Sequence, residues 1–183
     1  RRGAFFHAVE VYPFDHRHGE VPVGRLLDVD PSVFGVIGRD PALGGLDMRR
    51  ALFLDTETTG LAGGTGTLPF LIGLGSFADN GFRVEQFFMR DWDEEQAVLE
   101  ELASRFEKAE CLVSYNGRCF DMPLINTRFL LGRMRNPAGD LPHLDLLYPA
   151  RRMWRRRLGD CSLTSIERSV LGFGRVDDIP GFM

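Results

Sequence analysis

Hydrophobic and polar residues alternate or run together in patterns that divide the chain into strands and helices. Residues 5–12 alternate well enough to predict a strand, and a turn is expected after it at 18–20. Three further strands are expected at about 50–56, 68–77 and 82–89. The second of these three is a nearly continuous apolar run, which is typical of a central strand covered on both faces.

The second half of the chain combines helical spacing with short extended segments. Apolar residues keep helical spacing from the capping-box sequence at 93–96 to about residue 108. Strands are expected at 111–115 and 141–144, and Pro123 suits the first turn of a helix that ends near Leu131. Two more helices are expected near 145–157 and 162–171. This order predicts an α/β fold with a mixed central sheet of about five strands flanked by helices.

Length and local composition suggest how the chain is organised. A chain of 183 residues fits a single domain with a well-buried core. Residues 21–48 carry scattered Gly, Pro and Asp between a few apolar anchors, which favours irregular structure. We therefore expect residues 1–48 to form an N-terminal extension packed on the domain and residues 49–183 to form the domain itself.

Two carboxylates follow an apolar run at the end of the strand predicted for 50–56. Residues i and i+2 of a strand point to the same face, so Asp55 and Glu57 can converge on one point. Two such acids repel each other unless a cation lies between them, and Mg²⁺ or Mn²⁺ prefers oxygen ligands of this kind. The alternative is a strand end whose acids simply face water.

Two longer motifs resemble those of a known nuclease family. The segment Asp55–Leu61 (D-T-E-T-T-G-L) is similar to the first motif of the DnaQ-like, DEDD-type exonucleases, a four-acid branch of the ribonuclease H-like superfamily. Asn116 followed by Phe120-Asp121 is similar to the second motif of that family. Further segments resemble the YprB type of predicted exonuclease domain; they are the glycine-rich 61–68, His143–Leu146 and Asp177–Gly181.

This resemblance covers roughly residues 50–183 and implies a ribonuclease H-like fold with 3′–5′ exonuclease activity on single-stranded DNA or RNA. It implies that two ions, Mg²⁺ or Mn²⁺, support phosphodiester hydrolysis. By resemblance, Asp55 bridges both ions, Glu57 binds the ion that activates water, and Asp121 binds the second. Asp121 also suits a helix cap, a role compatible with metal binding because a helix end keeps a carboxylate ionised.

Thr58 and Asn116 are candidate contacts to the nucleic acid. Asn116 suits equally a bond to a substrate phosphate or sugar and a cap of its own turn. His143 and Asp145 share one face of a predicted strand end, a pattern that favours structure or substrate contact over catalysis.

The fourth acid and the general base of the family are missing from the recognised motifs. They normally lie on a C-terminal helix, and we expect that helix after Met183. Asp177 and Asp178 match a signature that precedes the helix, so Asp178, with His143 and Asp145, is only an accessory candidate.

Charge is distributed unevenly along a chain whose net charge is −4. The segment 128–157 holds only two aspartates and is rich in arginine, at positions 128, 133, 135, 151, 152, 155, 156 and 157. Such a segment suits contact with nucleic-acid phosphates, and we expect this role for Arg151, Arg152, Arg155 and Arg156. The alternative is a solvated helix face.

Other features narrow the class of protein. Three cysteines without C-x-x-C spacing favour reduced thiols and a cytoplasmic location. No apolar run approaches the length of a membrane span and none reads as a signal peptide, so we expect no membrane partner. Two alternatives to an exonuclease stay open: a nucleic-acid-binding module with an incomplete or degenerate site, and a small-molecule-binding α/β domain without metal.

Overall fold

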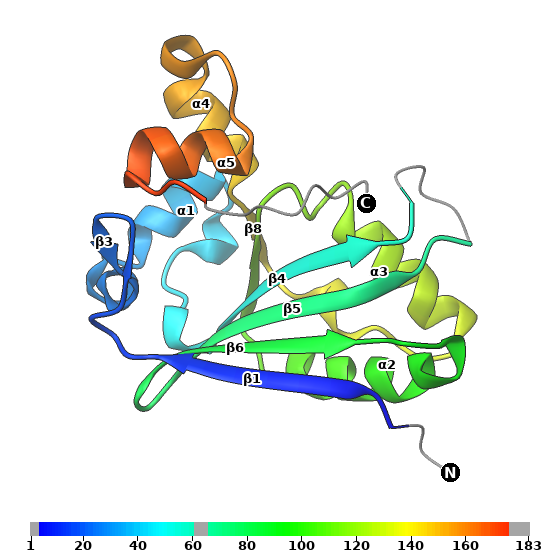
Figure 1. The fold of residues 1–183 in the computed structure, drawn as a ribbon. Helices are drawn as coiled ribbons and strands as arrows, with labels where there is room; N and C mark the ends of the chain where they lie inside the picture. Colours follow the sequence, from blue (N-terminus) through cyan, green and yellow to red (C-terminus); the bar gives the residue numbers. More distant parts are fainter. Residues whose placement is uncertain (1–3, 61–65, 176–183) are drawn as a thin grey trace.

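A six-stranded mixed sheet forms the centre of the computed structural model, which describes residues 4–60 and 66–175 (Figure 1). The strand order is β1-β6-β5-β4-β7-β8. Neighbours from β1 to β4 are antiparallel, whereas β4, β7 and β8 run parallel. The strands are β1 (Phe6–Tyr12), β4 (Ala51–Thr58), β5 (Pro69–Ala78), β6 (Gly81–Phe88), β7 (Cys111–Ser114) and β8 (His143–Asp145).

Helices α2 (Glu95–Phe106) and α3 (Asp121–Leu131) cover one face of the sheet. The helical spacing seen in the sequence directs Val98, Leu99 and Leu102 of α2 into the main hydrophobic core. Leu52 and Leu54 of β4 point into the same core. Packing in this core therefore supports β4 along its length as far as Leu54, the residue before the first acid.

The opposite face is covered by segments from the N-terminal part of the chain. Phe34 of α1 (Ser32–Gly38), Leu43 and Met48 pack with Val113 and Leu144 in a second buried cluster. Short 3₁₀ turns accompany α1 in this layer: η1 (Val23–Asp28), η2 (Pro41–Leu43) and η3 (Met48–Arg50). The division predicted at residue 48 stays a prediction, but residues before it supply both an edge strand and a covering layer.

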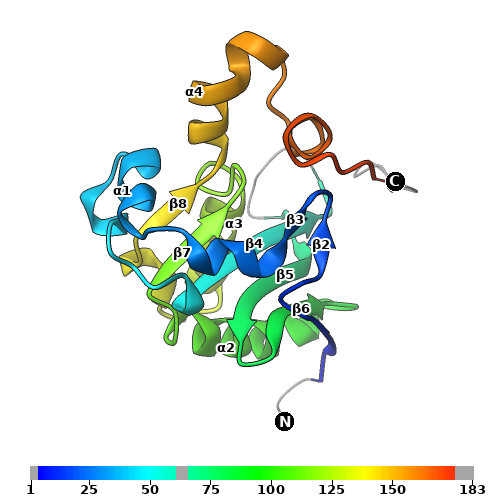
Figure 2. The ribbon, with the colours of Figure 1, turned by 90° about the vertical axis from the view of Figure 1, so that its left-hand side faces the viewer.

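Helices α4 (Leu147–Leu158) and α5 (Leu163–Ile166) project from one end of the sheet, as both views show (Figures 1 and 2). They share a small buried cluster of their own that includes Leu147, Ala150, Cys161 and Ile166. The chain continues from α5 as the π-helix η6 (Glu167–Leu171). The hairpin of β2 (Arg17–His18) and β3 (Val21–Pro22) meets η6, where Glu20 N donates to Leu171 O at 2.8 Å.

Three local features differ from the sequence expectations. The sheet has a sixth strand because β1 pairs antiparallel with β6. The helix expected over 162–171 changes from α to π geometry at Glu167. The capping box expected at 93–96 is absent. Instead the 3₁₀ turn η4 (Trp92–Glu94) precedes α2, and the side chain of Asp91 caps η4 by accepting from Trp92 N. Glu94 accepts a hydrogen bond from Arg90. A further 3₁₀ turn, η5 (Pro137–Asp140), precedes β8.

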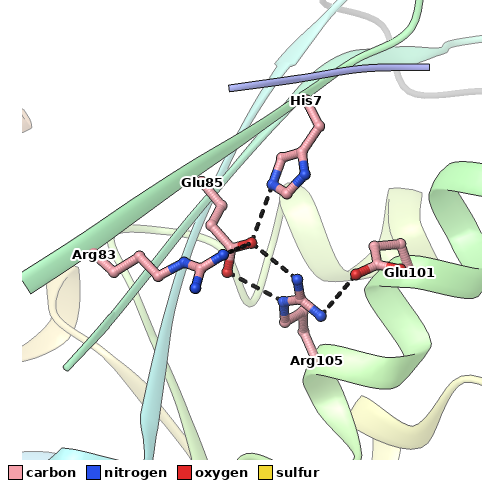
Figure 3. Close-up of polar contacts among 5 residues, drawn as sticks. All are labelled: His7, Arg83, Glu85, Glu101 and Arg105. Carbon is pink, nitrogen blue, oxygen red and sulfur yellow. Dashed lines mark hydrogen bonds and ion pairs between the residues drawn. The ribbon is translucent and has the colours of Figure 1, made fainter. Parts of the chain in front are cut away.

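A buried carboxylate ties β1 and β6 to α2 (Figure 3). Glu85 of β6 is only 3% exposed and accepts two bonds from Arg105 of α2, at 2.9 and 3.1 Å. His7 Nε2 of β1 and Arg83 Nη2 lie 3.0 and 3.1 Å from the same carboxylate. Burial alone would raise the pKa of Glu85, but the positive charges of Arg105, Arg83 and His7 outweigh it and lower the pKa.

Candidate metal and nucleic-acid site

Asp55 and Glu57 lie at the exposed end of β4, where the strand leaves the hydrophobic core. Alternation directs both away from the face that carries Leu54, as predicted from the sequence. The pairing of β4 with β5 shifts register between Glu57 and Thr58, a bulge that ends the regular ladder beside the acids. The Thr58 hydroxyl donates to Gly60 O at 3.0 Å and so stiffens the turn that follows.

Asp121 reaches the end of β4 from the first turn of α3. The Thr56 hydroxyl donates to Asp121 Oδ1 at 2.5 Å, which joins α3 directly to β4 between the two acids. Asp121 is the first residue of α3, and no side chain caps this helix, so the helix-cap role is not seen.

The three carboxylates influence one another electrostatically. Loss of hydration is the largest cause that raises the pKa of Asp55, although its side chain keeps contact with solvent, and the charge of Glu57 adds to it. Burial likewise raises the pKa of Asp121, the Thr56 bond lowers it, and the charge of Asp55 raises it again. The helix end was expected to favour the ionised form of Asp121, whereas burial raises its pKa.

Neighbouring carboxylates that lose hydration, as Asp55 and Asp121 do, suit a hard divalent cation, because a cation would offset both the repulsion and the lost hydration. The donor chemistry of Asp55, Glu57 and Asp121 therefore fits Mg²⁺ or Mn²⁺. Within residues 4–60 and 66–175, however, no three Asp, Glu, His or Cys side chains are grouped closely enough to enclose one ion. The three-carboxylate site thus stays a prediction that rests on two neighbouring pairs, Asp55 with Glu57 and Asp55 with Asp121.

The loop before α3 is fixed by Asp145 at the end of β8. Asp145 is 4% exposed, and its carboxylate accepts from three backbone N–H groups: Asn116 at 2.7 Å, Arg118 at 3.1 Å and Leu147 at 3.0 Å. These bonds hold Asn116 in a left-handed conformation with φ of 68°, which asparagine tolerates better than most residues. In this structure Asp145 organises the loop that carries Asn116 toward Asp121.

Gly117 lies in the tightest part of this loop. A side-chain carbon built on Gly117 would lie 2.5 Å from Ser114 Oγ and 3.0 Å from Asp121 Oδ2. Glycine is therefore needed here for close approach, and the loop backbone lies directly against the Asp121 carboxylate.

His143 has a structural bond rather than a free ring facing the acids. Its Nε2 lies 2.7 Å from Ser114 Oγ, which links β8 to β7. Burial, with the charge of Arg118, lowers the pKa of His143 to about 4, so the ring is neutral at physiological pH.

Arg175 is a neighbour of Asp55 that the sequence reasoning missed. Its charge lowers the pKa of Asp55, and its Nε donates to Glu167 Oε2 at 2.7 Å. The other oxygen of this buried glutamate lies 3.2 Å from His18 Nε2. No motif marks Arg175, because its place depends on how η6 packs against the N-terminal hairpin. Asp177 and Asp178 lie outside the described residues.

The basic residues of α4 do not all have the same surroundings. Arg151, Arg152, Arg155 and Arg156 are exposed, as predicted for phosphate contacts. Arg152 donates to Ile37 O of α1, so it joins two helices. Arg151 and Arg155 face the loop before α3 instead and line a pocket together with Asn116.

Comparison with known proteins agrees with this fold. A family model of the RNase H superfamily matches residues 52–183, and the chain belongs to that superfamily. It is also 35% identical over 175 residues to the uncharacterized protein YprB of Bacillus subtilis (strain 168). The match covers 94% of this chain and 42% of that relative. The predicted ribonuclease H-like fold and the resemblance to YprB are thereby confirmed.

Two further observations bear on the class of protein. Membership of the RNase H superfamily indicates nucleic-acid-related activity, and nucleases of this kind generally use divalent metals. Across the described ranges, no helix combines the length and the apolar character that crossing a bilayer requires.

Proposed function

We propose that this chain is a divalent-metal-dependent 3′–5′ exonuclease that hydrolyses single-stranded DNA or RNA by a two-metal mechanism. The observation that carries the proposal is the hydrogen bond that holds Asp121 of α3 against Thr56, the residue between Asp55 and Glu57 on β4, in a chain of the RNase H superfamily. The charge of Asp55 also raises the pKa of Asp121, as expected for neighbouring carboxylates. A cytoplasmic location is part of the same proposal.

Asp55, Glu57 and Asp121 would hold Mg²⁺ or Mn²⁺ in this function. Bound divalent cations would supply charge neutralisation at the phosphate and a water of lowered pKa. Because Asp55 and Asp121 have raised pKa values, protons compete with the metal for them at a higher pH than for ordinary aspartates. Metal affinity should therefore fall early on acidification.

The nucleic acid would lie between the acids and α4. Thr58 and Asn116 flank the carboxylates, while the arginines of α4 offer charge to the phosphates of the strand. Among residues 4–60 and 66–175 we assign no fourth acid, and Asp145 is already engaged by backbone donors.

Replacement of Asp55 by asparagine tests the activity. Asp55→Asn keeps the side-chain shape but removes the charge shared by both carboxylate pairs, so hydrolysis with Mn²⁺ should fall about 100-fold or more. The matched control is Asp79→Asn, an exposed aspartate in the turn between β5 and β6, which should leave the rate unchanged. Single strands labelled at the 5′ end report polarity, because 3′–5′ removal produces a ladder of shortened labelled products.

A second candidate is a nucleic-acid-binding module with an incomplete site. The absence of a three-ligand group among the described residues favours it. This function predicts that the wild-type chain binds single strands yet leaves them intact with Mn²⁺ or Mg²⁺. A metal-free small-molecule domain would show neither binding of single strands nor stabilisation by Mn²⁺ in thermal unfolding.

A further inference from the structure

A pocket of about 560 Å³ lies between the loop before α3 and the α4–α5 unit. Asn116, Arg151, Arg155, Asp160 and Ser162 contribute its polar lining. The volume falls in the range of small-ligand sites and exceeds what a bare phosphate ion would fill. A nucleotide is therefore a suitable occupant.

Arg151 and Arg155 give the pocket its charge. They are separated by one helical turn, so both guanidinium groups lie on the same side of α4. In the part of the chain that the structure describes, neither has a hydrogen-bond or ion-pair partner, unlike Arg152, which donates to Ile37 O. Planar guanidinium groups with free donors are the usual protein partners of phosphate.

Asn116 connects the pocket to the candidate metal site. Its backbone is fixed by Asp145, and its side-chain amide has no hydrogen-bond partner within the described ranges. The next residue, Gly117, lies against Asp121 Oδ2. One short loop therefore borders both the pocket and the carboxylates, so a strand bound at the acids has the pocket beside it.

Asp160 opposes an anion in this pocket. Its Oδ1 accepts from Ser162 N at 2.9 Å and its Oδ2 from Ser162 Oγ at 2.6 Å, so the carboxylate is held in place. Two arginines against one aspartate leave the lining positive, and removal of the Asp160 charge should strengthen anion binding.

We propose that this pocket binds a phosphate group of the nucleic-acid substrate or product, with Arg151 and Arg155 as the donors and Asn116 beside them. The inference rests on the proposed function and adds a phosphate subsite to it. It divides the basic face of α4, because Arg151 and Arg155 bind phosphate in the pocket whereas Arg152 has a structural bond.

Two matched pairs of substitutions test the subsite. Arg151→Ala with Arg155→Ala removes the pocket donors, and Arg157→Ala with Arg168→Ala removes the same charge from exposed positions outside the pocket. Binding of a labelled single-stranded oligodeoxynucleotide is measured over a salt series in EDTA, where no metal-dependent cleavage occurs. The double variant Arg151→Ala with Arg155→Ala, called the pocket pair, should bind the oligonucleotide about 100-fold more weakly, which is about tenfold for each lost charged contact. Its log–log salt slope should be lower by about 1.4.

The source of the phosphate is distinguished by competition. If the pocket takes a free phosphate monoester, a nucleoside 5′-monophosphate displaces the oligonucleotide from the wild type but not from the pocket pair. If it takes a phosphodiester of the strand, the monophosphate does not compete, although the pocket pair still weakens oligonucleotide binding. In both cases Asp160→Asn should tighten oligonucleotide binding about fivefold. This is the effect expected when the repulsion between one carboxylate and one phosphate charge in a watery environment is removed.

Equal effects of the two arginine pairs would overturn the inference, as would no binding of the oligonucleotide by the wild type. Circular dichroism melts of all variants confirm folding, and Asp160→Asn supplies an independent gain of affinity. Failure of the proposed exonuclease is seen separately, in the hydrolysis assay with Asp55→Asn. If the wild type hydrolyses single strands but the pocket pair binds the oligonucleotide as tightly as the wild type does, the phosphate subsite is disproved and the proposed exonuclease is not.

Discussion

At the scale of single residues, Asp145 shows that an acid near a candidate metal site can have an architectural role. Both of its oxygens accept backbone N–H groups, and the donors come from two segments, the loop at Asn116 and the start of α4 at Leu147. A buried carboxylate with three such donors fixes the loop geometry, since each donor left unpaired would cost desolvation energy.

Asp145→Asn should therefore destabilise the fold by about 1–3 kcal/mol, because the new amide presents a donor to one of the backbone N–H groups. Urea unfolding measures the change. Asp140→Asn is the control: Asp140 is exposed and its ion pair with Arg135 lies at the surface, so the substitution should cost about 1 kcal/mol or less. Unchanged or greater stability of Asp145→Asn would mean that the Asp145 charge is unfavourable in the fold, as expected for a vacant metal ligand.

The two kinds of acid differ in how far the sequence reveals them. Asp55 and Glu57 were predicted to share a face because strand alternation is a local property. The partners of Asp145 lie up to 29 residues away along the chain, and no local pattern specifies them. The same holds for Arg175, whose position beside Asp55 depends on contacts between η6 and the N-terminal hairpin.

At the scale of elements, the helix pair α4–α5 is joined to the end of the sheet by specific hydrogen bonds. One donor is Tyr115, at the end of β7, whose hydroxyl donates to Cys161 O at 2.5 Å. Burial is the main cause that raises the pKa of Tyr115 to about 12, so this donor keeps its proton at any physiological pH. The bond closes one wall of the pocket between the loop and α4.

Tyr115→Phe should loosen this wall without unfolding the domain. The lost bond is worth about 0.5–1.5 kcal/mol, and the ring still packs against the α4–α5 cluster. Hydrogen exchange should accelerate at residues 160–166 and stay unchanged in β4 and β5. Tyr148→Phe is the control, since the Tyr148 hydroxyl lies 3.3 Å from the exposed Cys119 thiol and does not join α4 to β7. Uniform acceleration across the sheet would contradict a local role.

Element positions followed well from periodicity, whereas element ends did not. The strand of 50–56 and the helix of 93–108 were predicted because burial imposes their spacing over many residues. The start of α2 differed because Arg90 captures Glu94 and Asp91 caps the preceding turn, so local side-chain competition decided it.

At the scale of the whole molecule, the Glu85 cluster joins the first strand of the chain to a helix nearly a hundred residues later (Figure 3). The sequence predicted a strand at 5–12 but placed it in an extension. Its pairing partner is β6, which is distant in the sequence. The Glu85 cluster helps to fix this pairing, and the spacing of hydrophobic residues does not reveal such a cluster.

Glu85→Gln should destabilise the protein by about 3–5 kcal/mol, because Arg105 would lose its main buried counter-charge. Thermal or urea unfolding at neutral pH measures this. Glu101→Gln removes a half-buried partner of the same arginine, far more accessible to water than Glu85, and should cost about 1 kcal/mol or less.

The Glu85 cluster also predicts how the stability of the fold changes at acidic pH. The pKa of Glu85 is lowered in the folded state, so its contribution is fully present above the unfolded pKa of about 4.3 and is lost as pH falls through the folded value. Wild-type stability should thus decline more steeply below this pH than that of Glu85→Gln. If the free energy of unfolding of the two proteins falls with the same slope at acidic pH, Glu85 is not the group whose protonation destabilises the fold.

The arrangement of the three cysteines gives the native chain a built-in reporter position. Cys111 and Cys161 are buried, and burial raises the pKa of the Cys111 thiol to about 11, whereas Cys119 is exposed two residues before Asp121. A maleimide dye should therefore attach at Cys119 without any engineering of the sequence. Fluorescence from that single position would report, in real time, whether the proposed ions and polynucleotides bind beside the carboxylates.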